Sequence, residues 1–153
     1  MEFRESDSIT AVSTPPGNGG ISIVRVSGEN ILDFVDQILL KRITPRTASF
    51  TSFFDSNEFI IDQGIAIYFP ASNSFTGQEV LELHCHGGRV ITDMIVSRCL
   101  ELGARMARPG EFTERAFLNG KLDLAQAEGI SDLINASSKS AARSASLSMQ
   151  GEF

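Results

Sequence analysis

An acid and two histidines form the pattern in this chain that most resembles a metal site. Glu82, His84 and His86 alternate along a predicted strand, so they share one face of it. Imidazole and carboxylate groups can bind zinc, but a structural zinc site uses four protein ligands. The sequence offers no obvious fourth ligand. We therefore favour a polar sheet face over a metal site, and such a face can also line a pocket.

Two cations stand where they could serve a pocket. Arg25 lies near the end of a predicted strand, and Lys121 follows the Asn119-Gly120 turn. A guanidinium group binds a carboxylate through a bidentate fork, so Arg25 is a candidate for holding an anionic ligand. The alternative for Arg25 is an ordinary surface arginine. Lys121 is either solvated or directed into the junction between the sheet and the later helices.

The glycine-rich loop at residues 14–20 has a composition that suggests phosphate binding, but its spacing does not fit. It lacks the Gly-Lys-Ser/Thr ending of a nucleotide P-loop. The third glycine of a dinucleotide fingerprint would fall at Ser22, and a strand follows in place of a helix. We interpret the loop as a tight turn that approaches a ligand or another subunit.

Residues 108–129 form a junction that is rich in functional groups. A short amphipathic helix is predicted there, with Phe112 and Phe117 on its apolar side, and Asn119-Gly120 ends it. Asp123 then begins a new helix, with Gln126 as its capping-box partner. Spacing alone predicts a capped, salt-bridged helix-loop-helix surface. Its polar groups are Arg108, Glu111, Arg115, Asn119, Lys121 and Asp123.

The elements that position these groups follow from periodicity and turn residues. Ser27 is the expected N-cap of the first helix, and Met94 is expected to face the core with Ile91, Ile95 and Leu102. Strands are predicted at residues 9–13, 21–27, 47–54, 59–69, 79–86 and 104–107. Helices are predicted at residues 28–40, 89–102, 124–136 and 141–150. This order predicts an α+β fold with a largely antiparallel sheet, followed by the start of a helical region.

Composition narrows the class of protein. The chain has 153 residues and a net charge of −6, which suits one domain with an extension and disfavours nucleic-acid binding by charge alone. Cys85 and Cys99 are too few for a disulfide framework and fit a reducing, cytoplasmic setting. A signal peptide and a membrane-spanning segment are not apparent. Helical-looking sequence continues to Phe153, so we expect a piece of a longer protein.

Three motifs carry a family resemblance. Residues 14–28 (TPPGNGGISIVRVSG), 75–88 (FTGQEVLELHCHGG) and 108–128 (RPGEFTERAFLNGKLDLAQAE) closely resemble the N-terminal region of the MnmE (TrmE) family of tRNA modification GTPases. The resemblance covers essentially the whole chain, and the third motif is long and specific. The first motif alone would be weak.

The resemblance implies a fold and a role. Residues 1–120 would be a folate-binding and dimerisation domain similar to the folate-binding part of the glycine-cleavage aminomethyltransferase. Residues 121–153 would be the first helices of a central helical domain, whose inserted GTPase domain lies outside this sequence. Such proteins work in the cytoplasm as homodimers. With the FAD-dependent partner MnmG they modify C5 of the wobble uridine of tRNA, using GTP hydrolysis that depends on Mg²⁺ and K⁺.

The site residues implied by motif position are Arg25, Glu82 and Lys121. They would contact a 5-formyl- or 5,10-methylene-tetrahydrofolate, with Glu82 at the pterin edge and the two cations at anionic or carbonyl groups. The resemblance implies no catalytic residue in this region and no GTP hydrolysis by it alone. Gln78 departs from the family's usual Thr-Gly-Glu-Asp pattern. The alternatives are a stand-alone aminomethyltransferase-like enzyme and a purely structural dimerisation domain.

Overall fold

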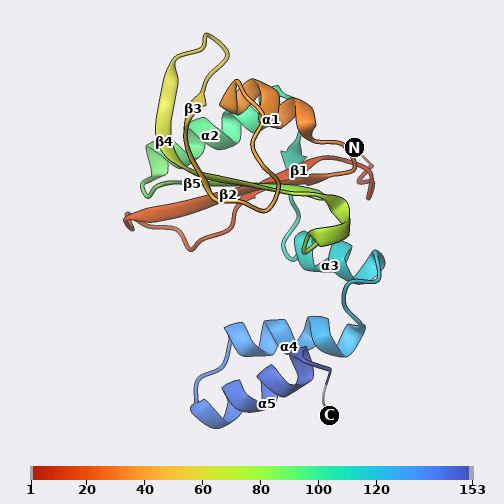
Figure 1. The fold of residues 1–153 in the computed structure, drawn as a ribbon. Coiled ribbons are helices and arrows are strands. Elements are labelled where there is room, and N and C mark those ends of the chain that lie inside the picture. The colour runs from red at the N-terminus through yellow and green to blue at the C-terminus, as the bar shows by residue number, and fades with distance from the viewer. Residues whose placement is uncertain (1, 152–153) are drawn as a thin grey trace.

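The computed structural model describes residues 2–151 and has an α+β fold (Figure 1). Within that range one six-stranded sheet is formed by β1 (Ile9–Val12), β2 (Ile21–Gly28), β3 (Ser49–Phe54), β4 (Ile60–Phe69), β5 (Glu79–His86) and β6 (Arg105–Met106). The α-helices are α1 (Leu32–Leu39), α2 (Arg89–Glu101), α3 (Glu111–Leu118), α4 (Leu124–Ile134) and α5 (Lys139–Met149). A short 3-10 helix, η1 (Ala71–Asn73), follows β4.

The sheet is largely antiparallel, as predicted. Its strand order is β3-β4-β5-β2-β1-β6, and β6 alone pairs in parallel, with β1. The long pairing of β2 with β5 sets Arg25 directly opposite Glu82. Residues directly opposite one another in an antiparallel pair have their side chains on the same face. The register therefore brings together two candidate site residues that are far apart in the sequence.

The two faces of the sheet have different environments. Helices α1 and α2 cover one face (Figure 1), and the alternation along β2 and β5 directs Val24, Val26, Leu81 and Leu83 into the core on that side. Each fully buried aliphatic side chain contributes about 1.5–3 kcal/mol by leaving water. The residues that alternate with these, Arg25 and Glu82 among them, lie on the opposite face of the sheet.

Two local predictions are wrong, one about the start of α1 and one about α2. The first helix begins at Leu32, with Ile31 at its N-cap position, and Ser27 is buried in β2, where its Oγ lies 2.8 Å from Thr76 Oγ1. Ser27 and Gly28 both pair with β5, so β2 continues through Ser27 and this residue does not cap the helix. Met94 was expected to face the core but is 42% exposed. Ile95 forms the buried stripe of α2 with Cys99 at the i+4 position, and Met94 falls beside that stripe.

The C-terminal helices pair with each other on the other side of the sheet from α1 and α2 (Figure 1). The predicted capping box is present, because Asp123 accepts from Gln126 N (2.7 Å) and Gln126 accepts from Asp123 N (3.0 Å). Ser138 caps α5 two residues earlier than expected. A side chain on Gly129 would meet Met149 N at 2.7 Å, so the two helices pack closely.

Within residues 2–151, no helix combines the length and the apolar character needed to cross a membrane. The helical pattern expected to continue to Phe153 reaches outside the described residues, as does the start of the predicted 1–120 unit.

Candidate functional site

Arg25 and Glu82 form an ion pair on the sheet face opposite α1 and α2. Arg25 Nη2 donates to Glu82 Oε2 at 3.1 Å, and their side chains are 24% and 17% exposed. His84 Nε2 lies 3.0 Å from the other carboxylate oxygen, Oε1. Both oxygens of Glu82 are thus held in place by neighbours on the same face, and each keeps a lone pair for a further donor.

Two aromatic rings enclose the Arg25 guanidinium. Its Cζ lies 5.9 Å from the ring centroid of Phe75 and 5.3 Å from that of Phe112. These distances are within the range of cation–π attraction. Arg25 Nε is buried and has no hydrogen-bond partner among residues 2–151. Of the two interpretations left open by the sequence, a surface arginine and a pocket cation, this environment favours the second.

A cavity of about 470 Å³ opens beside this arginine. One wall is formed by residues 11–13 and Arg25, and α4 supplies Ile130 and Ile134. A further wall is formed by Phe75 with residues 107–110, Phe112 and Thr113. Within the described residues its lining holds two arginines, Arg25 and Arg108, and no acid. The volume lies in the range of about 300–1,000 Å³ that small-molecule sites occupy. The cavity is therefore cationic, partly aromatic and large enough for a cofactor.

Lys121 lies outside the lining of this cavity. Its Nζ donates to the Ser72 carbonyl at 3.0 Å. Its Cγ lies 3.4 Å from where a side chain on Gly77 would begin, so the lysine runs along the loop after β4. The same loop carries Phe75 to Arg25. The structure thus brings Arg25 and Glu82 into contact and connects Lys121 to them only through this loop.

The two histidines have different partners. His86 Nδ1 lies 2.9 Å from Asp62 Oδ1, and the His86 N–H donates to Oδ2 of the same carboxylate at 2.8 Å. His84 contacts Glu82, as described above. Within residues 2–151 no group of three or more potential ligands is close enough to hold a metal ion. The acid and the two histidines therefore share a face but do not converge.

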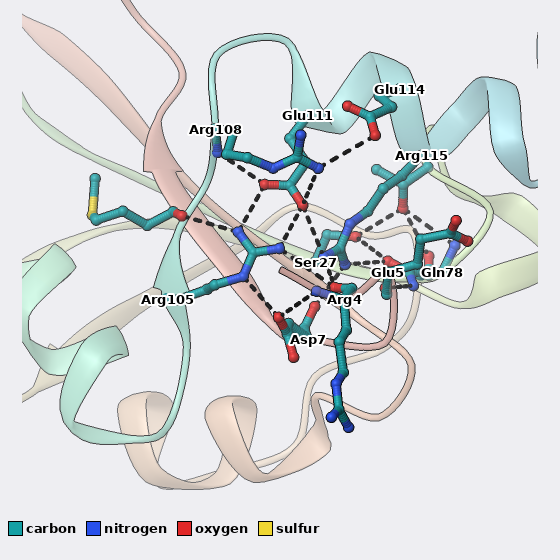
Figure 2. A network of polar contacts seen from close by, with 12 residues as sticks. Arg4, Glu5, Asp7, Ser27, Gln78, Arg105, Arg108, Glu111, Glu114 and Arg115 are labelled. Carbon is teal, nitrogen blue, oxygen red and sulfur yellow. Dashed lines mark hydrogen bonds and ion pairs between the residues drawn. The ribbon is translucent and has the colours of Figure 1, made fainter. Parts of the chain in front are cut away.

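Glu111, the first acidic residue of the third motif, is the centre of a buried ion network (Figure 2). Arg105 donates to both of its oxygens (2.7 and 2.9 Å), Arg115 donates at 3.2 Å and the Arg108 N–H at 2.8 Å. Burial alone would raise the pKa of Glu111, but the hydrogen bonds from Arg105 and the Arg108 backbone and the nearby charges lower it to about 2. This carboxylate remains ionised at any physiological pH.

The network ties the N-terminal segment to the third motif. Arg115 Nη1 donates to the Asp7 carbonyl at 2.7 Å and to Gln78 Oε1 at 2.8 Å, and Gln78 donates to the Glu5 carbonyl at 2.8 Å. Gln78, which departs from the family pattern, therefore has a structural role here. The predicted ion pairs are confirmed, and Asn119, Lys121 and Asp123 are exposed as predicted. The prediction of a surface is wrong for Glu111 and Arg115, which are each only 1% exposed.

The glycine-rich loop makes a close backbone contact with Gly87. A side chain on Gly87 would meet the Gly19 carbonyl oxygen at 1.7 Å, and the Gly87 N–H donates to the Gly20 carbonyl at 3.2 Å. Only glycine fits at residue 87 without moving this loop. The contact of the loop with a ligand or a second subunit remains a prediction.

Comparison with known proteins identifies the family. The family model described as "GTP-binding protein TrmE N-terminus" matches residues 8–121. The chain is 58% identical over 153 residues to the tRNA modification GTPase MnmE of Methylococcus capsulatus, covering 100% of this chain and 34% of that protein. It is 59% identical over 151 residues to MnmE of Nitrosomonas europaea, covering 99% and 34%.

A more distant relative, MnmE of Neisseria meningitidis serogroup B, is 55% identical over 146 residues, which are 95% of this chain and 33% of that protein. The chain thus spans about a third of the length of the curated relatives it matches. The matched family model, the identities and the three motifs agree with one another, and the chain belongs to the TrmE (MnmE) family of tRNA modification GTPases, matching its N-terminal region.

Proposed function

We propose that this chain binds a tetrahydrofolate derivative at the Arg25–Glu82 pair and acts as the folate-binding, dimerising module of a tRNA modification GTPase. The observation that supports this most is the pairing of a cation and an acid beside a cationic, aromatic cavity of about 470 Å³. We also propose that the α+β fold is similar to the folate-binding part of the glycine-cleavage aminomethyltransferase.

The chemistry of the residues fits this ligand. A pterin presents an amidine-like edge whose N–H groups pair with a carboxylate, and the Glu82 carboxylate is oriented by Arg25 and partly exposed. Arg25 has a buried Nε without a partner among the described residues. Lys121 would exchange its bond to the Ser72 carbonyl for a carbonyl or anionic group of the ligand. The ligand would be the 5-formyl or 5,10-methylene form, which supplies a one-carbon unit.

The wider role rests on the names of the relatives, which are tRNA modification GTPases. In the whole protein, GTP hydrolysis with Mg²⁺ and K⁺ would come from segments outside this chain. The FAD-dependent MnmG and a tRNA would be partners in modifying C5 of the wobble uridine, in the cytoplasm. Within this chain we assign binding and assembly roles, and we assign no catalytic residue.

The dimerisation part of the proposal is supported by the sheet face opposite α1 and α2. Phe50, Ile65, His84 and Ile23 lie in one row across β3, β4, β5 and β2. Phe50 is 70% exposed. The other three residues of the row are half-buried. Large exposed apolar patches mark association surfaces, and Phe50 would be the apolar centre of such a surface here. We expect a dimer by light scattering at micromolar concentration and a weaker dimer for Phe50→Asp, and a wild-type monomer would contradict the assignment.

Isothermal titration calorimetry with 5-formyltetrahydrofolate tests the binding role. We expect saturable binding that weakens by about tenfold or more in Glu82→Gln and in Arg25→Ala, because each removes a charge-assisted hydrogen bond. Asp93→Asn is the matched control, since Asp93 is an exposed acid on α2. No heat at millimolar ligand would rule out the role and leave a structural dimerisation domain. One-carbon transfer by the chain alone would favour the stand-alone enzyme.

A further inference from the structure

We infer that the cavity between β1, residues 107–113 and α4 is the subsite for the aromatic, anionic part of the ligand, and that Arg108 is its cation. This inference rests on the proposed function, because Arg25 belongs both to the pair with Glu82 and to the cavity lining. It adds a binding residue from the third motif and states which part of the ligand that residue receives.

The walls suit a flat ring. Phe75 and Phe112 line the cavity from the loop after β4 and from α3, and Ile130 and Ile134 line it from α4. Aromatic and aliphatic side chains on opposite walls can enclose a planar group on both faces. The two phenylalanine rings already contact the Arg25 guanidinium, at 5.9 and 5.3 Å, so a ring bound here would extend that stack.

The charges favour a carboxylate over a cation. Arg25 already pairs with Glu82. Arg108 lies 5.3 Å from the ring centroid of Phe3, but its side chain is 40% exposed and its ion pairs to Glu114 and Glu111 are long, at 3.3 and 3.5 Å. Glu111 is also shared with Arg105 at 2.7 Å. A guanidinium has five N–H donors, so Arg108 keeps donors for a ligand carboxylate.

Because α4 lines the cavity, ligand binding there should change the dynamics of this helix. Helix α4 contacts α3 and α5, and it follows α3 through residues 119–123. A ligand in the cavity touches both the sheet and α4, through Ile130 and Ile134. Binding should therefore slow the hydrogen exchange of α4 amides, since it links the helix to the sheet. That readout responds to where the ligand lies, in addition to how tightly it binds.

The test uses p-aminobenzoyl-glutamate, a ring with carboxylates and without a pterin, in NMR titrations of the ¹⁵N-labelled chain. We expect shifts at the amides of Thr113 and Ile134 and slower exchange along α4. Arg108→Ala should weaken this binding by about tenfold or more, and Arg108→Lys should restore part of it. Arg89→Ala is the matched control, because Arg89 is an exposed arginine beside a different cavity.

The fold should survive the Arg108 substitutions, because the backbone N–H of residue 108 still donates to Glu111 (2.8 Å) and Arg105 still pairs with it. Thermal melting checks this. Shifts that are equal in wild type and Arg108→Ala, or absent at millimolar fragment, would overturn the inference.

The same variants separate this inference from the proposed function. If 5-formyltetrahydrofolate binds in a manner that depends on Glu82 but not on Arg108, the proposed function stands and the subsite is refuted. If the fragment binds through Arg108 and the full folate binds no more tightly than the fragment, the subsite stands and pterin recognition by Glu82 is refuted.

Discussion

Replacing Glu111 with glutamine keeps the shape of the side chain but removes the charge at the centre of the buried network. Arg105 retains Asp7 as a partner at 2.8 Å. Arg115, whose side chain is 2% exposed, would be left with neutral acceptors only, namely Gln78, backbone carbonyls and the new amide oxygen. Removing one partner of a buried ion pair typically costs about 3–5 kcal/mol, because the remaining charge stays buried.

The lowered pKa of Glu111 gives a second value for the contribution of its charge to folding stability. A fall from an ordinary 4.5 to about 2 corresponds to about 3 kcal/mol of folding stability. Because the folded state lowers this pKa, the contribution is fully present above about pH 4.5 and is lost as the pH falls toward 2. The wild type should lose this stability in acid. Glu111→Gln should show only the weaker slope from groups such as Asp7 and Asp62, whose pKa values are also lowered.

Urea unfolding followed by tyrosine fluorescence measures both effects, because Tyr68 in β4 is the only tyrosine and the chain has no tryptophan. We expect Glu111→Gln to lose about 3 kcal/mol at pH 7. Glu114→Gln, which removes the half-exposed partner of Arg108, should change stability by less than about 1 kcal/mol. A loss below about 1 kcal/mol for Glu111→Gln at pH 7, or an unchanged acid slope, would refute the reasoning.

Two further predictions concern packing and thiol reactivity. Gly87→Ala should lower stability by about 2–3 kcal/mol in the same assay, because its methyl group would overlap the Gly19 carbonyl. Gly20→Ala, with open space at the new atom, should stay within about 0.5 kcal/mol, and equal losses in the two variants would contradict the contact. Burial raises the pKa of Cys85 to about 11 and the pKa of Cys99 to about 12. Iodoacetamide at pH 8 should therefore modify both thiols in urea and neither in the native chain, and rapid native labelling, measured by mass spectrometry, would contradict their burial.

Features set by local sequence could be predicted. The alternation along β5 places Leu81 and Leu83 in the core and Glu82 and His84 on the other face, as expected. The capping box of Asp123 and Gln126 is also local, since both partners lie within one helical turn. In each case the information lies within a few neighbouring residues, so periodicity and cap chemistry were sufficient.

Features set by distant partners could not be predicted from spacing. Ser27 is a residue type preferred at helix N-caps, but its pairing with Val80 in β5 keeps it in a strand. Glu111 and Arg115 have the i, i+4 spacing of a surface pair, yet the N-terminal segment around Asp7 covers them from about a hundred residues away. Sequence reasoning also missed Arg108 as a cavity residue, although its presence in the third motif was a signal.

The contacts within the candidate site also depend on residues that are far apart in the sequence. The family resemblance singled out Arg25, Glu82 and Lys121, and spacing alone could not place any of them together. The register of β2 and β5 pairs the first two, and Lys121 contacts Ser72 instead. Phe75 and Phe112, which enclose Arg25, come from a loop and a helix whose approach depends on the tertiary fold.

A crystal structure of the chain grown with 5-formyltetrahydrofolate would show whether a tetrahydrofolate binds beside the Arg25–Glu82 pair. We expect the pterin edge on the Glu82 carboxylate and the ligand's ring between Phe112 and α4. Ligand density confined to the cavity between the glycine-rich loop and α2, or a site that leaves the Arg25–Glu82 pair untouched, would contradict this expectation.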